Sequence, residues 1–319
     1  MENHHLLWLK EGIIDLPKKP TTDQLTQVRY DDLGDTTLTA KGIEFIKENH
    51  ERPFFLYLAL TATHTHITPH KQFRGTSEIG QLGDYINELD FHVGEIMSTL
   101  ETLGLDDNTV LFFSSDNGGA LKDHSSAGKN LSLKDPSQDV GAKAKTAKID
   151  ARKKHGHRTN GELNMGKGSN FEGGHRVPFI VRWPNEIAAG SKTDQIITLT
   201  DTLATVAGFL EKKLPNSAGL DSFDISPVML GRTLDTPRQA AILQTSKGAL
   251  AFRRGSWKIR FSKPTIWHGE RPELPKNGPE LYHLSKDPGE QNDVSAQHPD
   301  RVEMMSARLL DLLIQGRSR

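Results

Sequence analysis

Two uninterrupted apolar runs, residues 53–60 and 109–114, constrain the fold more than any other feature of this 319-residue chain. A strand in the middle of a parallel sheet is buried on both faces, so its sequence is apolar along its whole length. Before each run, residues 37–49 and 86–103 place apolar side chains three and four positions apart, which predicts a helix. A third apolar run covers residues 177–183. Strands alternating with helices predict an α/β protein with a mixed, largely parallel sheet flanked by helices.

The pattern changes after residue 237. Short apolar segments at residues 241–243, 249–253 and 257–261 are separated by turns that contain glycine, which is typical of antiparallel strands. A closing helix is predicted by four apolar residues at helical spacing, Val302, Met305, Leu309 and Leu312. We therefore divide the chain into a first domain, residues 1–236, and a small C-terminal antiparallel subdomain with its closing helix, residues 237–319.

Composition excludes several classes of protein. A formal net charge of −1 and a pI of about 6.9 argue against a nucleic-acid binder. The absence of cysteine excludes disulfides, thiolate metal sites and a cysteine nucleophile, so the chemistry must come from oxygen and nitrogen groups. Residues 1–10 lack the basic lead and the apolar core of a secretory signal, and no stretch is long enough to span a membrane. These observations leave the cellular compartment undetermined.

Residues 121–160 form a polar segment without a helical or strand period. The segment contains ten Lys and Arg residues against four Asp, and it has no aromatic residue. One interpretation is a solvated basic insertion loop, because unpatterned polar segments are usually of that kind. The other is an electrostatic guide for a polyanionic substrate. Bases of a single-stranded nucleic acid stack on aromatic side chains, so a nucleic-acid partner is not expected here.

Asp116 and Asn117 directly follow the second apolar run, in the sequence Ser115-Asp116-Asn117-Gly118. Open α/β sheets bind their ligands beyond the carboxyl ends of the strands, which is where these two side chains are expected. Carboxylate and amide oxygens are suitable calcium ligands, but calcium takes six to eight oxygens, so two cannot complete a site. The alternative is that the same residues simply build a turn.

Lys167 stands between Gly166 and Gly168, within the glycine-rich residues 166–174. Glycine lets the backbone come close to an anion, and an ammonium is a compact point charge suited to a tetrahedral oxyanion. His64 follows the first apolar run and can donate to a leaving oxygen when it is protonated. The alternatives are a surface lysine, a capping or packing imidazole, and a functional role for His66 in place of His64.

Together, the Asp116-Asn117 pair, the glycine-framed Lys167 and His64 resemble the formylglycine-dependent sulfatases, which belong to the alkaline phosphatase superfamily. Residues 284–290 are also similar to a segment of the small antiparallel sheet that these enzymes carry near their C-terminus. The resemblance covers nearly the whole chain but matches only the later part of the family domain. It therefore implies that residues 1–236 are the distal part of a sulfatase catalytic domain, truncated at its N-terminus.

The resemblance implies hydrolysis of sulfate esters with a divalent cation, usually calcium. Asp116 and Asn117 match the family's metal ligands, Lys167 matches the lysine that binds the sulfate oxygens, and His64 matches the histidine that contacts the ester. The expected substrate is a sulfated small molecule or polysaccharide, and family members are often periplasmic, secreted or lysosomal. The phosphoester and phosphonate hydrolases of the same superfamily are the alternative enzyme class.

The resemblance also implies parts that this chain does not contain. The family's nucleophile is a formylglycine made from Cys or Ser in the motif Cys/Ser-x-Pro-x-Arg, and the sequence has no residue in that setting. Asp31-Asp32 spells the family's first aspartate pair, but it follows a polar segment, so we interpret it as the approach to the first helix. The sequence therefore predicts a chain that is inactive alone. It is a gene fragment, a subunit completed by a separately encoded N-terminal half, or a non-catalytic anion-binding remnant.

Overall fold

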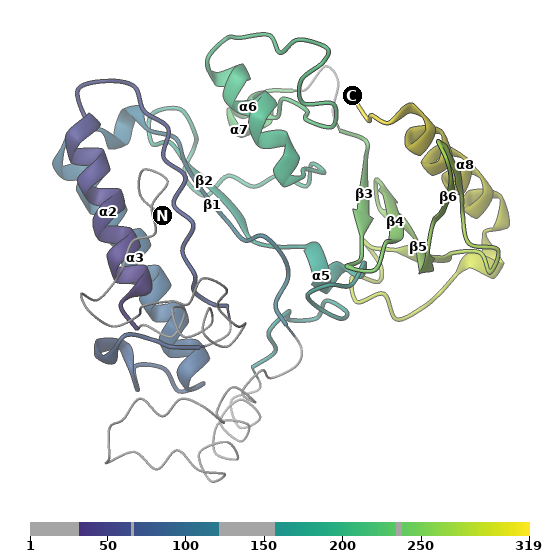
Figure 1. Cartoon of the computed structure of the whole chain (residues 1–319), viewed down its shortest axis with the longest axis horizontal. Helices are drawn as coiled ribbons and strands as arrows, with labels where there is room; N and C mark the ends of the chain where they lie inside the picture. The colour runs from purple at the N-terminus through teal and green to yellow at the C-terminus, as the bar shows by residue number, and fades with distance from the viewer. Residues whose placement is uncertain (1–31, 65–66, 121–156, 234–237) are drawn as a thin grey trace, which may run out of the picture. The chain divides into compact units, whose positions relative to one another are not determined.

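The computed structural model describes residues 32–64, 67–120, 157–233 and 238–319 (Figure 1). The chain divides into two compact units, the first formed by residues 1–109 and 122–158, the second by residues 110–121 and 159–319. The domain boundary that we predicted at residue 236 falls inside the second unit, and it stays a prediction. Most of the basic segment 121–160 lies outside the described residues.

The first unit contains two long helices, α2 (Gly34–Asn49) and α3 (Gln81–Thr102), which pack on each other (Figure 1). Ile46 of α2 is buried, as are Ile96 and Leu100 of α3, so the helical periodicity of both segments is confirmed. Short 3-10 helices, η2 (Lys71–Phe73) and η3 (Asp106–Asn108), lie on either side of α3 in the sequence. Polar Glu88 and His92 are also buried on α3, which the apolar spacing did not predict.

Residues 53–60 run extended after α2, but they form no ladder with any other described residue. Their side chains alternate between two environments. The Phe54 ring meets that of Phe45 edge to face at 5.9 Å, whereas Phe55 and Tyr57 are 71% and 82% exposed. The prediction of a strand buried on both faces is therefore wrong for this segment, because only one face is covered.

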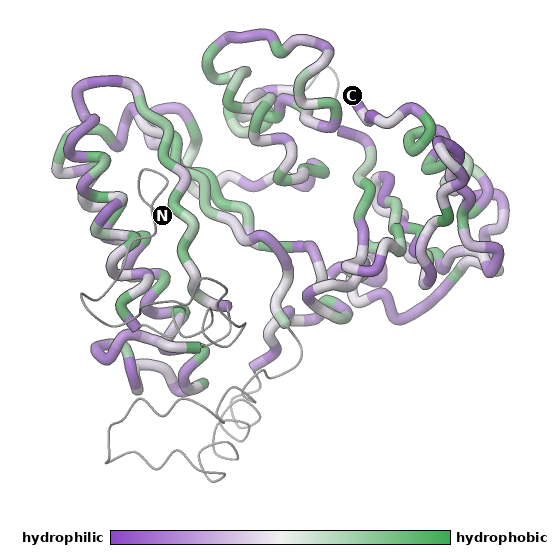
Figure 2. The backbone as a smooth tube through the Cα atoms, viewed as in Figure 1, coloured by the Kyte–Doolittle hydropathy of each residue, from purple (hydrophilic) through white to green (hydrophobic). Residues whose placement is uncertain are grey.

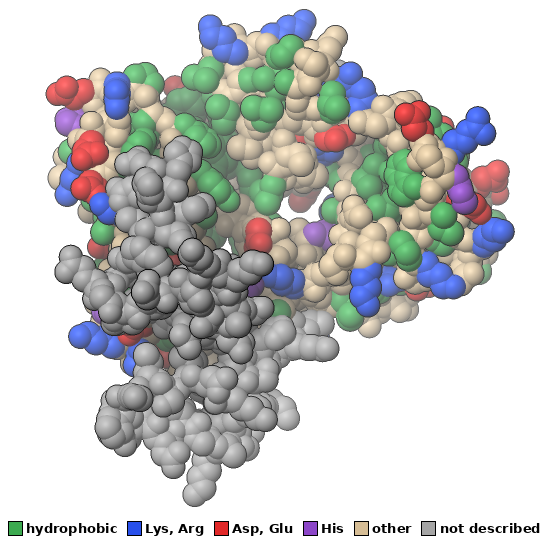
Figure 3. All heavy atoms as spheres, viewed as in Figure 1, with side chains coloured by type: hydrophobic (Ala, Val, Ile, Leu, Met, Phe, Trp, Pro, Cys, Tyr) green, Lys and Arg blue, Asp and Glu red, His purple; other side chains and the backbone are tan. Residues whose placement is uncertain are grey.

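The second unit begins with β1 (Leu111–Ser114), which pairs antiparallel with β2 (Phe179–Arg182). Figure 2 shows both strands as largely apolar. The strand pairs formed by the described residues are all antiparallel, so the largely parallel arrangement that we predicted for the sheet is not seen among these residues. Helix α6 (Thr202–Phe209) follows the 3-10 helix η5 (Leu199–Asp201). Leu203 and Leu210 are exposed there, where Figure 3 shows hydrophobic side chains on the surface.

The C-terminal part of this unit is a four-stranded antiparallel sheet in the order β3-β4-β5-β8, covered by helix α8 (Pro299–Gln315) (Figure 1). The predicted antiparallel strands and closing helix are confirmed. The core between sheet and helix is formed by buried side chains that include Phe252, Ile259, Leu281 and Leu309. The strands are β3 (Ala240–Gln244), β4 (Ala249–Arg254), β5 (Trp257–Pro264) and β8 (Glu280–His283).

Five further short elements are described in the second unit. The hairpin of β6 (Ile266–His268) and β7 (Arg271–Glu273) was not predicted from the sequence. The others are the short helices α5 (Glu172–His175) and α7 (Ser226–Met229) and the 3-10 helix η6 (Ser295–Gln297).

Candidate functional site

Asp116 and Asn117 lie in the turn that follows β1, as predicted. The Ser115 hydroxyl donates to the carbonyl oxygen of Asn117 at 3.1 Å, and the Asn117 amide nitrogen donates to the carbonyl oxygen of Gly118 at 3.1 Å. Asp116 is exposed, and its carboxylate has no hydrogen-bond or ion-pair partner among the described residues. The turn therefore fixes its own backbone while leaving the Asp116 carboxylate and the Asn117 side-chain oxygen open to a ligand.

Lys167 lies in a loop with two unusual backbone conformations. Met165 has a φ of 57° and Gly168 a φ of 83°, in the region that favours glycine. The amide of Ser169 donates to the carbonyl oxygen of Gly166 at 3.0 Å and closes a tight turn around Lys167. The Lys167 side chain is exposed. We define residues 164–174 as the Lys167 loop.

The Lys167 loop and the turn of residues 115–119, which we call the Asp116 turn, are held together by backbone hydrogen bonds. The Lys167 amide donates to the carbonyl oxygen of Gly119 at 3.1 Å, and the Gly118 amide donates to the carbonyl oxygen of Gly174 at 3.0 Å. The approach is so close that a Cβ on Gly118 would overlap the carbonyl oxygen of Gly173. Position 118 therefore requires glycine, because any side chain there would prevent the two predicted motifs from coming into contact.

Asn160, which sequence analysis did not single out, fastens the same contact. Its side-chain oxygen accepts from the Gly119 amide at 2.9 Å, and its side-chain nitrogen donates to the carbonyl oxygens of Gly119 at 3.0 Å and Met165 at 2.8 Å. A single amide side chain thus bridges the Asp116 turn and the Lys167 loop. No sequence pattern marked this residue, because its partners are up to 41 residues away.

His64 belongs to the first unit, where it is exposed in the turn after the extended residues 53–60. Its amide donates to the carbonyl oxygen of Thr61 at 2.8 Å. The turn is held by Asp35 of α2, which is buried and accepts from the Thr61 amide at 2.6 Å and the Ala62 amide at 2.8 Å. Asp35 is a second residue that sequence analysis missed. His66, the alternative to His64, lies outside the described residues.

The oxygens of Asp116 and Asn117 could form only part of a metal site. Calcium takes six to eight oxygen ligands, and these two side chains supply two. Within the described ranges, no group of three or more His, Asp or Glu side chains could hold a metal ion. Of the Asp31-Asp32 pair, Asp31 lies outside the described residues and Asp32 accepts from the Arg74 guanidinium at 2.9 Å.

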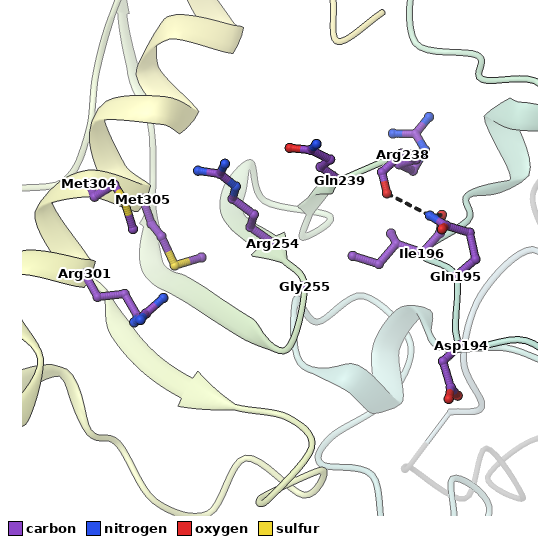
Figure 4. A pocket seen from close by; sticks show the side chains of 10 residues that line it. All are labelled: Asp194, Gln195, Ile196, Arg238, Gln239, Arg254, Gly255, Arg301, Met304 and Met305. Carbon is purple, nitrogen blue, oxygen red and sulfur yellow. Dashed lines mark hydrogen bonds between the residues drawn. The ribbon is translucent and has the colours of Figure 1, made fainter. Parts of the chain in front are cut away.

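A pocket of about 570 Å³ opens elsewhere in the second unit (Figure 4). None of the predicted site residues lines it. One of its arginines, Arg238, is already neutralised, since its Nε donates to the buried carboxylate of Asp201 at 3.0 Å. The pocket is thus distinct from the contact between the Asp116 turn and the Lys167 loop. Its other charged or polar lining residues are Asp194, Gln195, Gln239, Arg254 and Arg301.

Comparison with known proteins identifies the family. The family model described as Sulfatase matches residues 9–211, which is more than half of the chain. The chain belongs to the sulfatase family. The predicted resemblance to the sulfatases is therefore confirmed, and the roles of Asp116, Asn117, Lys167 and His64, which lie within the matched region, stay predictions.

Two curated relatives are similar to this sulfatase-family chain over most of its length. An N-acetylgalactosamine-6-O-sulfatase of Bacteroides thetaiotaomicron is 35% identical over 277 residues, which cover 85% of this chain and 49% of that protein. An N-acetylgalactosamine-6-sulfatase of Mus musculus is 32% identical over 292 residues, which cover 84% of this chain and 50% of that protein. The chain thus spans about half the length of the curated relatives it matches.

A solved structure from work on glycosaminoglycan metabolism by Bacteroides thetaiotaomicron is also similar to the chain. The two structures superpose with a TM-score of 0.73 at 34% sequence identity, and the aligned region covers 89% of this chain and 55% of the solved one. The likeness confirms the predicted α/β fold of the sulfatases and alkaline phosphatases. Within the part of the chain that the structure describes, no helix is long and apolar enough to cross a membrane.

Proposed function

We propose that this chain supplies the sulfate-binding and cation-binding part of a sulfate ester hydrolase. The observation that carries the proposal is the pair of backbone hydrogen bonds that joins the Asp116 turn to the Lys167 loop. They hold on adjacent loops an exposed ammonium and a carboxylate that has no partner among the described residues. An ammonium neutralises the oxygens of a bound sulfate, and a carboxylate attracts a divalent cation to the same anion.

The cation that we propose is calcium. Asp116 and the side-chain oxygen of Asn117 would hold it, together with ligands from outside the two loops, since calcium needs more oxygens than these residues have. When bound, the cation would stabilise the negative charge on the sulfate oxygens. Lys167 contributes to the same stabilisation from the facing loop.

His64 is proposed to assist departure of the alcohol. A protonated imidazole can donate to the oxygen of the breaking ester bond and so prevent a free alkoxide from forming. Asp35 fixes the backbone of the turn that carries His64, because its carboxylate accepts from two successive amides of that turn. The role of Asp35 in this proposal is therefore to position His64.

The proposed substrate is a 6-O-sulfated N-acetylgalactosamine unit of a sulfated polysaccharide. Support comes from the two curated relatives, both of which are named for 6-sulfated N-acetylgalactosamine. Polymers of this kind carry many negative charges. The positively charged segment 121–160, of which residues 121–156 lie outside the described residues, is proposed to attract them.

The chain alone is proposed to lack turnover. Formylglycine is made from Cys or Ser in Cys/Ser-x-Pro-x-Arg, and the 319 residues contain no such motif. Deleting a nucleophile removes the covalent route rather than weakening it. A separately encoded N-terminal half would be the partner that supplies it.

Calorimetry with inorganic sulfate and an assay with an aryl sulfate test this proposal. The purified chain should bind sulfate, and Lys167→Ala should weaken binding about 10-fold to 100-fold, the range expected for one lost charged hydrogen bond. Lys212→Ala, which removes another exposed lysine of the second unit, is the matched control and should bind as the unmodified chain does. Turnover should be at background. Sulfate binding that is unchanged in Lys167→Ala would refute the role of that lysine, and measurable turnover would refute the proposed inactivity.

A further inference from the structure

A buried ionic cluster lies next to the Lys167 loop, and its members come from three separate parts of the second unit. Lys258 of β5 and Glu172 of α5 are each 0% exposed, and Glu290, in the turn after β8, is 2% exposed. The Lys258 ammonium lies 3.0 Å from a carboxylate oxygen of Glu172 and 2.9 Å from one of Glu290. It also lies 3.2 Å from Nε2 of His175. We call these four residues the Lys258 cluster.

Burying charged side chains away from water costs free energy, so the presence of this ionic cluster in the interior needs an explanation. Removing a carboxylate or an ammonium from water is unfavourable, and an apolar replacement of similar volume is often as stable. Burial is the largest single effect and raises the pKa of Glu172, but Lys258, with smaller contributions from His175 and Arg253, lowers it by more, and the net effect is a lowered pKa. Glu172 is thus held as a carboxylate facing a buried ammonium. Stability alone does not explain why the cluster is ionic.

Glu290 connects the cluster directly to the backbone of the Lys167 loop. Its carboxylate accepts from the Glu172 amide at 2.6 Å, and its carbonyl oxygen accepts from the Asn164 side chain at 3.3 Å. Glu290 has a φ of 50°, a conformation in which a residue other than glycine is strained. The side chain at this position is therefore kept at a cost to the backbone, which fits a residue that is needed for its carboxylate.

Asn170 forms a second attachment between the loop and the sheet. Its side-chain nitrogen donates to the carbonyl oxygens of Leu250 and Phe261, each at 3.0 Å, and its side-chain oxygen accepts from Nε of Arg260 at 2.9 Å. Asn170 is 1% exposed. Between Asn170 and Glu172, the loop is thus pinned to β4, β5 and the turn after β8 over three consecutive residues.

The pinned residues are continuous with the site. Gly173 and Gly174 directly follow Glu172. The Gly173 amide donates to the carbonyl oxygen of Asn164 at 2.8 Å, and the Gly174 carbonyl accepts from the Gly118 amide at 3.0 Å. An unbroken series of short contacts therefore leads from the Lys258 cluster to both the Lys167 loop and the Asp116 turn.

We propose that Glu172, Lys258 and Glu290 are positioning residues that set the Lys167 ammonium against the Asp116 turn. The inference rests on the proposed function in one respect only, namely that the ligand placed between these loops is sulfate. None of the three residues needs to touch that ligand. They act by fixing the backbone on which Lys167 stands, so the C-terminal sheet is a support for the anion site as well as a separate folded layer.

Amide hydrogen exchange of the full chain tests the inference without requiring any activity. In Glu290→Gln, the amides of Gly118, Lys167 and Gly173 should exchange at least 10-fold faster, while the amides of the core strands β4 and β5 keep their rates. Glu303→Gln, an exposed glutamate of α8, is the matched control and should leave all of these rates unchanged. Loop exchange that stays slow, or a uniform increase across the sheet, overturns the positioning role.

A second variant and a second measurement complete the test. Glu172→Gln should give the same local increase, so the inference can be judged even if Glu290→Gln does not fold. Calorimetry with inorganic sulfate should then show binding about 10-fold weaker in both variants. Faster loop exchange with unchanged sulfate affinity overturns the inference. If the unmodified chain binds no sulfate, the proposed function fails, and the exchange measurement alone decides the positioning role.

Discussion

Replacing His175 with glutamine should make the second unit more resistant to acid. Burial and the neighbouring Lys258 ammonium lower the pKa of His175 from 6.5 to about 4. The unfolded chain therefore takes up a proton near pH 6.5 that the folded chain takes up only near pH 4. Because the unfolded state binds more protons within this window, the free energy of unfolding falls as the pH falls through it.

The magnitude follows from these two values. Relative to its value at pH 7.5, the free energy of unfolding should be lowered by His175 by about 1.4 kcal/mol at pH 5.5 and by about 2.6 kcal/mol at pH 4.5. Glutamine keeps a side-chain acceptor for the Lys258 ammonium and cannot be protonated in this range. The variant should thus be close to the unmodified protein at pH 7.5 and more stable than it at pH 4.5.

Urea denaturation followed by tryptophan fluorescence measures this difference, because Trp183, Trp257 and Trp267 all report on the second unit. The free energies of unfolding of the unmodified chain and of His175→Gln would be compared at pH 7.5, 5.5 and 4.5. His268→Gln, on the exposed β6–β7 hairpin, is the matched control and should follow the unmodified chain. A constant difference between the chain and His175→Gln at all three pH values would refute the reasoning.

Two further predictions concern the metal and the uncovered strand. Calcium binding to the chain should be no tighter than millimolar and should be lost in Asp116→Ala but not in Asp311→Ala, an exposed control; micromolar affinity measured by calorimetry would show that further ligands complete the site. The chain should self-associate through the exposed Phe55 and Tyr57, and replacing both with serine should lower light scattering and dye binding by removing about 4 kcal/mol of apolar contact. Trp267→Ser, which removes an exposed ring from the second unit, should change neither signal.

The sequence predicted the helices and strands best where their apolar residues recur at regular spacing and pack against neighbouring segments of the chain. The C-terminal strands and α8 have their apolar residues at regular spacing, and their core forms between neighbouring segments, so local pattern and tertiary contact agree. Residues 53–60 show the opposite case. Their apolar run predicts two covered faces, but what covers a strand depends on other segments, and the described residues cover only the face that holds Phe54.

For the candidate site, sequence reasoning selected the side chains that we propose a ligand would contact, and it missed the residues that hold their loops in place. Asp116 and Lys167 stand in short motifs whose residue types suit a cation and an oxyanion. Glu172 and Lys258, by contrast, are separated by 86 residues, and Glu290 lies 118 residues beyond Glu172. Partners at such distances have no local signature, and a single charged residue in a strand is usually solvated, so neither its burial nor its partner could be deduced.

One local signal was nevertheless present in β5, where basic and apolar residues alternate. Successive side chains of a strand point to opposite faces, and here Ile259 and Phe261 join the core under α8, whereas Lys258 and Arg260 contact the Lys167 loop. Both faces of the strand are thus covered, one by a helix and the other by the loop of the proposed site. Such an alternation usually indicates that the polar face of a strand is exposed to solvent, but here the polar face holds the Lys167 loop. Lys258 donates to Glu172 and Arg260 donates to Asn170, and these two acceptors lie within three consecutive residues of the Lys167 loop.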